Sequence, residues 1–354
     1  METHCKGPKG RGEANFTHQA ILALASFVFM VLILLFLWYA SNVLLLFFLS
    51  VLLAVFLRGL AALLQHKARL PEKLSLVVVI IILLAVFTFS GWFLAPRVSS
   101  QIDILSRDLP RALGHLKSGI ERYNWGQKLI AKIPNTDELI NSTFQILKRT
   151  YGIFASTLGV LASTVIVLLV GLYLAFDPQT YLKGIIRLIP QSRRRRADEV
   201  LHELGSSLTH WLIGRFFAMA FVGFFVALGL WIMGIHLALT LSIIAGLLDF
   251  IPYLGPLVAV LPAILLGLLE SPAKVFYIIL LYGVVLSIEG YVFTPLVQQR
   301  EVSVPPVLTL ISQILMGLFF GILGLVLATP LAACAVALVR MLYIEDVLGD
   351  LSGS

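Results

Sequence analysis

The chain has 354 residues, of which 59% are hydrophobic and only 13% are charged. A soluble domain carries about 25% charged residues. Apolar runs of about 20 residues, each long enough to cross a bilayer, recur along this sequence. These features exclude a soluble globular protein and predict an all-α polytopic membrane protein with about eight transmembrane segments. The net charge of +7 does not indicate nucleic-acid binding, because membrane proteins concentrate Lys and Arg in the loops that set their orientation.

Residues 1–96 are expected to hold three transmembrane spans. The apolar runs cover about residues 20–39, 41–57 and 75–94. The sequence ASN between the first two runs predicts a turn. The loop at 58–73 is short and basic, which places it on the cytoplasmic side together with the basic N-terminal segment.

Residues 97–150 form the one long polar segment of the chain. Leu and Ile recur in its first half at spacings of three and four, which is typical of an amphipathic helix. We therefore expect a small helical insert outside the membrane, on the side opposite the basic loop. Packing against the spans or against a neighbouring subunit is its simplest role.

Residues 151–210 are expected to contain the fourth span and a basic, amphipathic cytoplasmic segment. Four consecutive arginines are the strongest topology signal in the chain: Arg193, Arg194, Arg195 and Arg196. They are expected to hold this loop in the cytoplasm, and anionic lipid is an alternative partner. The apolar stripe at 200–211 predicts an amphipathic helix that lies along the membrane surface or leads into the next span.

Residues 211–342 are expected to form a transport core, followed by a cytoplasmic tail at 343–354. Two segments of this core, 237–269 and 306–340, are apolar over more than 30 residues but are interrupted in the middle. A straight helix of that length would measure about 50 Å, which exceeds the thickness of the bilayer core. Each segment is therefore either a re-entrant hairpin or a kinked full span, and the charge rule does not choose between them.

The two interruptions occupy corresponding positions. Pro252 and Gly255 break the first segment, and Gly321 and Gly324 break the second. A shift of 69 positions places Gly255 on Gly324, which suggests an internal repeat. Interrupted segments in corresponding positions indicate the binding site of a transporter.

Ionisable residues inside apolar segments are costly and usually functional. Asp249 lies at the first break, and Glu289 lies well inside the next apolar run. Arg215, near the start of the fifth span, is a candidate charge partner for either carboxylate. A structural hydrogen bond to the broken backbone is the alternative role. The candidate substrate- or ion-binding residues are Asp249, Pro252, Gly255, Glu289, Gly321 and Gly324.

The motifs of ATP hydrolysis and of common hydrolases do not occur in the sequence. It contains no GxxxxGK followed by Ser or Thr, no HExxH and no GxSxG. The seven His are scattered singly, and Cys5 and Cys334 lack metal-ligand spacing. We therefore expect a non-enzyme with no cofactor and no metal, and two free thiols.

Several blocks of the sequence together carry a family resemblance. They are GLYLAFDPQTYLKGIIRLIP, AGLLDFIPYLGPLVAVLPA, EGYVFTPLV and GLFFGILGLVLATPLAA. With them the chain resembles the autoinducer-2 exporter family of bacterial inner-membrane proteins, over nearly its whole length. The resemblance implies a multispan transporter that forms homo-oligomers. The substrates attributed to this family include autoinducer-2 for some members and sodium–proton exchange for others.

The leading hypothesis is a secondary transporter in the bacterial inner membrane, with both termini cytoplasmic. It would export a small polar solute, either an autoinducer-2-like signal or a cation, by alternating access coupled to an H⁺ or Na⁺ gradient. The site would lie between the two breaks. The alternatives are a cation/proton antiporter, a passive channel in which the breaks form a filter, and a non-transporting membrane scaffold.

Overall fold

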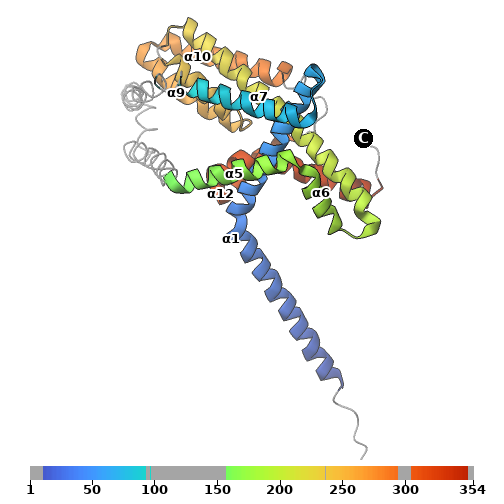
Figure 1. The fold of residues 1–354 in the computed structure, drawn as a ribbon. Coiled ribbons are helices and arrows are strands. Elements are labelled where there is room, and N and C mark those ends of the chain that lie inside the picture. Colours follow the sequence, from blue (N-terminus) through green and yellow to red (C-terminus); the bar gives the residue numbers. More distant parts are fainter. Residues whose placement is uncertain (1–10, 93–95, 97–156, 236, 294–303, 350–354) are drawn as a thin grey trace, which may run out of the picture. The chain divides into compact units, whose positions relative to one another are not determined.

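The structure is a computed structural model that describes residues 11–92, 96, 157–235, 237–293 and 304–349. Its described residues form helices and turns, with no strand among them (Figure 1). Within these residues, five helices are long and apolar enough to cross a membrane, or up to six if one bent pair counts as a span. The prediction of an all-α, multi-pass membrane protein is confirmed, and the count of eight segments stays a prediction. The expected insert at 97–150 lies outside the described residues.

The chain divides into two compact units, Met1–Leu46 and Phe47–Ser354. The described part of the first unit belongs to α1 (Arg11–Ala68), which continues into the second. The turn predicted at the sequence ASN is wrong, because α1 is unbroken there. The Ser41 hydroxyl donates a hydrogen bond of 2.7 Å to the Trp38 carbonyl within the helix. One Ser and one Asn do not stop a helix that strong helix formers flank on both sides.

In the second unit, the later part of α1 packs with the helix Glu72–Trp92 and with α5 (Thr157–Phe176). Their shared cluster is formed by Ala54, Leu57, Ala61, Leu76, Val79 and Ala175. α5 ends at a bend of 85° into α6 (Pro178–Arg187). Asp177 caps α6 by accepting hydrogen bonds from the backbone N–H and the hydroxyl of Thr180. The hydroxyl hydrogen bond lowers the pKa of the Asp177 carboxyl and so favours the ionised form of this cap.

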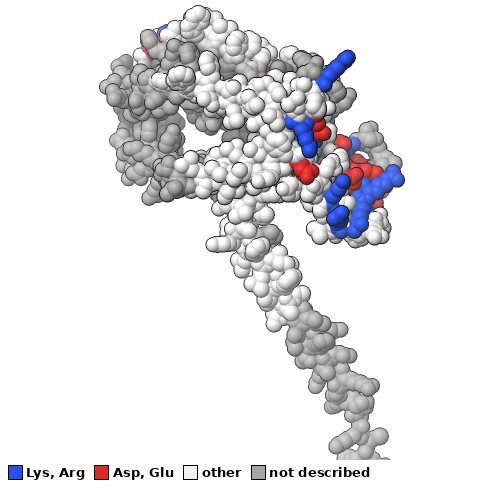
Figure 2. Space-filling model, viewed as in Figure 1, with Lys and Arg blue, Asp and Glu red and all other residues white. Residues whose placement is uncertain are grey.

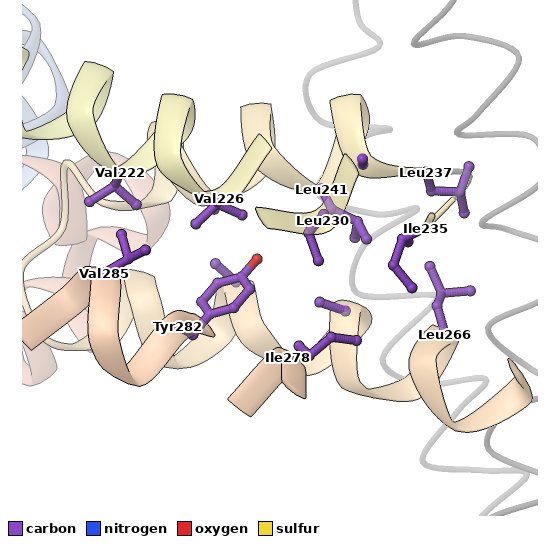
Figure 3. Packing of buried hydrophobic residues seen from close by; sticks show 14 residues of the cluster. Val222, Val226, Leu230, Ile235, Leu237, Leu241, Leu266, Ile278, Tyr282 and Val285 are labelled. Atoms are coloured by element: carbon purple, nitrogen blue, oxygen red, sulfur yellow. The ribbon is translucent and has the colours of Figure 1, made fainter. Parts of the chain in front are cut away.

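Four consecutive helices form the main apolar core, which Figure 3 shows from close by. They are α7 (Arg194–Ile232), α8 (Ala238–Leu248), α9 (Leu254–Glu270) and α10 (Pro272–Ile288). α7 and α8 cross where Gly223 meets Gly246, and a Cβ on Gly246 would lie 2.9 Å from the Met219 carbonyl oxygen. Small residues allow such close backbone approach between membrane helices. At the other end of the core, Leu237 lies beside Leu266 (Figure 3), so α8 and α9 run back alongside each other.

The last long helix, α12 (Pro306–Val339), leads into the short π-helix η3 (Arg340–Glu345). Gly321 has φ of 64° and ψ of −147°, a conformation open to glycine but not to other residues. Gln313 contacts Thr329 at 3.3 Å across this point. Sixteen residues of straight helix would separate the two by about 24 Å. α12 therefore folds back on itself at Gly321. Insertion of this segment, or of α8 and α9, as a re-entrant hairpin in a membrane stays a prediction.

Candidate functional site

Three buried ionisable side chains meet where the ends of α8 and α10 pack against α7. On α7, Arg215 places Nη2 3.3 Å from Oδ1 of Asp249 and Nη1 3.2 Å from Oε1 of Glu289. The exposed fractions of the three side chains are 7%, 1% and 12%, respectively. The structure thus brings together the two carboxylates predicted from the sequence and the arginine considered as their partner. We call Arg215, Asp249 and Glu289 the charge cluster.

Asp249 is held at the end of α8 by a strained turn. Pro252 prevents the helix from continuing. Tyr253 has a φ of 65°, and the N–H of Leu254 donates a 2.8 Å hydrogen bond to the Pro252 carbonyl, which closes a γ-turn. A γ-turn with positive φ is rare and strained. Backbone strain of this kind concentrates at functional sites, so the turn supports a role beyond packing.

Gly255 begins the return of the chain into α9, and only glycine fits its position. A Cβ on this residue would lie 1.7 Å from the carbonyl oxygen of Leu248. The side chain of Phe250 holds the same turn against α7, because its ring packs edge-on to Trp211 with centroids 5.7 Å apart. The turn is therefore fixed on both sides, and Asp249 has a defined place beside α7.

Glu289 lies where α10 changes into a π-helix. The regular helix ends at Ile288, and η2 (Glu289–Phe293) follows with one wide turn. Short π-helical turns at the ends of α-helices are frequent at functional sites. The change of helical pitch begins at the carboxylate that pairs with Arg215.

The charge cluster is not electrically balanced by its own residues. One guanidinium faces two carboxylates, so the sum is −1 when both acids are ionised. Among these three residues there is therefore one carboxylate more than Arg215 neutralises, and one proton or one monovalent cation would balance the three charges.

A fourth buried residue connects the strained turn to α12. The side chain of Gln313 is fully buried, and its Nε2 donates to the Pro252 carbonyl at 2.9 Å and to the Thr329 hydroxyl at 3.3 Å. It therefore joins the break of the first apolar segment to both halves of the second. Sequence analysis missed Gln313, although a lone amide in an apolar run is a signal of a buried hydrogen bond.

We expect Gln313→Leu to lower the free energy of unfolding by about 1–3 kcal/mol. The change keeps the side-chain volume but leaves the Pro252 carbonyl and the Thr329 hydroxyl without their donor. Denaturation in mixed micelles measures the difference. Ser312→Ala is the matched control, because its exposed hydroxyl bonds, among the described residues, to the Leu308 carbonyl of its own helix. Equal stability of the two variants would show that the Gln313 contacts are dispensable.

The other predicted glycines lie in α12. Gly321 forms the fold-back, and a Cβ on Gly324 would lie 2.2 Å from the Met316 carbonyl oxygen of the same helix. Gly321 therefore provides the backbone conformation of the fold-back, and Gly324 allows the close packing of α12 against itself. Binding of a solute or ion by Gly321, Gly324, Pro252 or Gly255 stays a prediction.

The four predicted arginines lie at the start of α7. Arg194 donates to the backbone carbonyls of Ile189 and Arg187, and Arg195 pairs with Glu199 at 3.2 Å. Arg196 binds two acids of the C-terminal region, Glu345 at 2.9 Å and Asp346 at 3.0 Å. Arg196 thus ties the end of α12 to the start of α7, a structural role that sequence analysis did not foresee.

Comparisons with known proteins agree on one class. The family described as "AI-2E family transporter" matches residues 27–344. Two relatives carry the name "Putative transport protein". YueF of Bacillus subtilis (strain 168) is 24% identical over 285 residues, which are 75% of this chain and 76% of YueF. In Synechocystis sp., sll0060 is 25% identical over 309 residues, which are 81% of this chain and 82% of sll0060.

Proposed function

The chain belongs to the AI-2E family of transporters, and from this premise we propose that it is a secondary transporter that exports a small polar solute against its gradient. The observation that carries the proposal is the charge cluster, because a buried arginine with two carboxylates has no packing advantage over apolar residues of equal size. We propose a bacterial inner-membrane location with a cytoplasmic C-terminus. The cytoplasmic N-terminus expected from the sequence required the turn at ASN, which α1 does not make. The solute is an autoinducer-2-like signal or a cation, and the coupling ion is H⁺ or Na⁺.

The mechanism follows from the charge count of the cluster. A proton or Na⁺ that enters binds one carboxylate of the cluster and weakens the hold of Arg215 on Asp249 or Glu289. Asp249 lies on the strained turn, so a change at its carboxylate is transmitted to the backbone of that turn. Through Gln313 the turn is hydrogen-bonded to α12. Ion binding would thereby bias the positions of both broken segments, which alternating access requires.

Gradient-driven flux in proteoliposomes tests the function. The purified chain is reconstituted, an H⁺ or Na⁺ gradient is imposed, and the movement of autoinducer-2 and of Na⁺ is followed. Uphill movement of either solute supports a coupled transporter. Downhill movement alone would establish a passive channel instead, and the absence of any flux would favour a membrane scaffold.

The re-entrant arrangement of the broken segments predicts where the loop between α9 and α10 lies. With re-entrant hairpins, this loop faces the outside, whereas kinked full spans place it inside. We expect Ala273→Cys, in a chain with Cys5 and Cys334 replaced by Ala, to react with an impermeant maleimide added to intact cells. Gln191→Cys, in the arginine-rich loop, is the inward-facing control. Labelling of Ala273→Cys only after permeabilisation would establish the kinked-span arrangement.

A further inference from the structure

The short helix α6 has an apolar edge that no part of the described chain covers. Tyr181, Ile185 and Leu188 are exposed on this edge, and α6 contains no buried residue. At 100° per residue, these three side chains lie within one third of the helix circumference. Lys183 and Arg187 lie on the opposite edge. The helix is therefore amphipathic, with its apolar edge open.

The position of α6 indicates what the open edge faces. α6 leaves α5 at 85°, and α5 has the composition of a membrane span. A helix perpendicular to a span lies along the membrane surface. Its ten residues extend for about 15 Å, which fits the plane of the headgroups rather than the hydrocarbon core. Asp177 fixes the bend by capping α6, and Arg194 fixes the other end by binding the Ile189 and Arg187 carbonyls.

Apart from Asp177, which caps α6 and interacts electrostatically with Lys183, the charges on and just after α6 are positive and mostly free of acidic partners. Lys183, Arg187 and Arg193 are exposed and form no ion pair with an acid in the described part of the chain. Figure 2 shows Lys and Arg gathered at this end of the unit, with several Asp and Glu among them, whereas the face of the apolar core is nearly free of charge. Cations beside an open apolar edge complement a surface of anionic phospholipids.

We propose that α6 lies in the membrane interface, with Tyr181, Ile185 and Leu188 among the lipid chains and Lys183, Arg187 and Arg193 on anionic lipid phosphates. The helix would anchor the arginine-rich start of α7 at a fixed depth. The proposal concerns the lipid surface alone and does not depend on the transported solute.

Spin labels on the full-length protein test the depth of each edge. Single cysteines replace Ile185 and Lys183 in turn, in the chain with Cys5 and Cys334 changed to Ala, and the protein is reconstituted in phosphatidylcholine vesicles containing phosphatidylglycerol. We expect the label at 185 to be several-fold more accessible to oxygen than to a water-soluble nickel chelate, relative to the label at 183. Preferential access of the chelate at 185 would overturn the proposal. Burial of the 185 label from both reagents would also overturn it, because protein would then cover the edge.

The anionic component is tested separately. We expect the oxygen preference at 185 to fall when phosphatidylglycerol is omitted, and to fall equally when Lys183, Arg187 and Arg193 are changed together to Gln. Lys274→Gln, at the start of α10, is the control for removal of a cation away from α6. An oxygen preference that is the same with and without phosphatidylglycerol would refute the role of the three cations.

Discussion

Replacement of Arg215 by Met is expected to lower the free energy of unfolding by about 3–5 kcal/mol, which is the usual cost of leaving a buried charge without its partner. Arg215 is the one cation that contacts Asp249 and Glu289 in the described residues, and both carboxylates are nearly excluded from solvent. Met retains most of the side-chain volume, so the loss reports charge rather than a cavity. Denaturation in mixed micelles measures the difference from the unchanged chain.

The same substitution on the surface of the same helix is the control. Arg195 pairs with Glu199, but its side chain is 93% exposed. Arg195→Met should change stability by less than about 1 kcal/mol, because exposed ion pairs contribute little. If Arg215→Met and Arg195→Met lower the free energy of unfolding equally, then leaving Asp249 and Glu289 without Arg215 has no special cost.

A triple variant separates the role of charge from that of shape. Arg215→Met combined with Asp249→Asn and Glu289→Gln removes all three charges at nearly constant volume. Buried ion networks replaced as a whole by apolar residues are often neutral in stability, whereas Asn and Gln keep polar atoms that need partners, so stability should recover in part. Recovery of stability in the triple variant, with loss of transport, would mean that the cluster is retained for function at the expense of stability.

The members of the charge cluster could be predicted from the sequence, but their meeting could not. Asp249 and Glu289 are conspicuous because ionisable residues are rare in apolar segments. Arg215 and Glu289, however, are 74 residues apart, and their contact depends on how α7, α8 and α10 pack. That packing rests on close approaches such as Gly223 to Gly246, which only three-dimensional contacts show.

The breaks illustrate the same division between local and tertiary information. Pro252 predicts an interruption from its own chemistry. The strained backbone conformation, with a positive φ, belongs to Tyr253, and tyrosine gives no local sequence signal for a positive φ. In the opposite sense, the sequence ASN predicts a turn that α1 does not make, because tertiary and helical context overrides the preference of two polar residues.

Glu289→Gln is expected to abolish gradient-driven transport while the chain stays folded. With glutamine in place, Arg215 and Asp249 alone form a neutral pair. The variant then lacks the ionisable group that we propose binds H⁺ or Na⁺ beside Arg215. Glutamine keeps the length of the side chain and can still accept a hydrogen bond from Arg215, so the loss of stability should be smaller than in Arg215→Met.

Proteoliposomes that contain a pH-sensitive dye measure this effect, with an Na⁺ or H⁺ gradient imposed across the membrane. Glu270→Gln is the matched control, because Glu270 pairs only with Lys274 at the half-exposed junction of α9 and α10 among the described residues. It should retain coupled flux. Since Asp249→Asn leaves the same neutral sum as Glu289→Gln, both variants should fail together. Coupled flux that persists in Glu289→Gln would show that this carboxylate has no part in coupling. Loss of coupled flux in only one of the two variants would show that a single carboxylate, rather than the cluster, binds the ion.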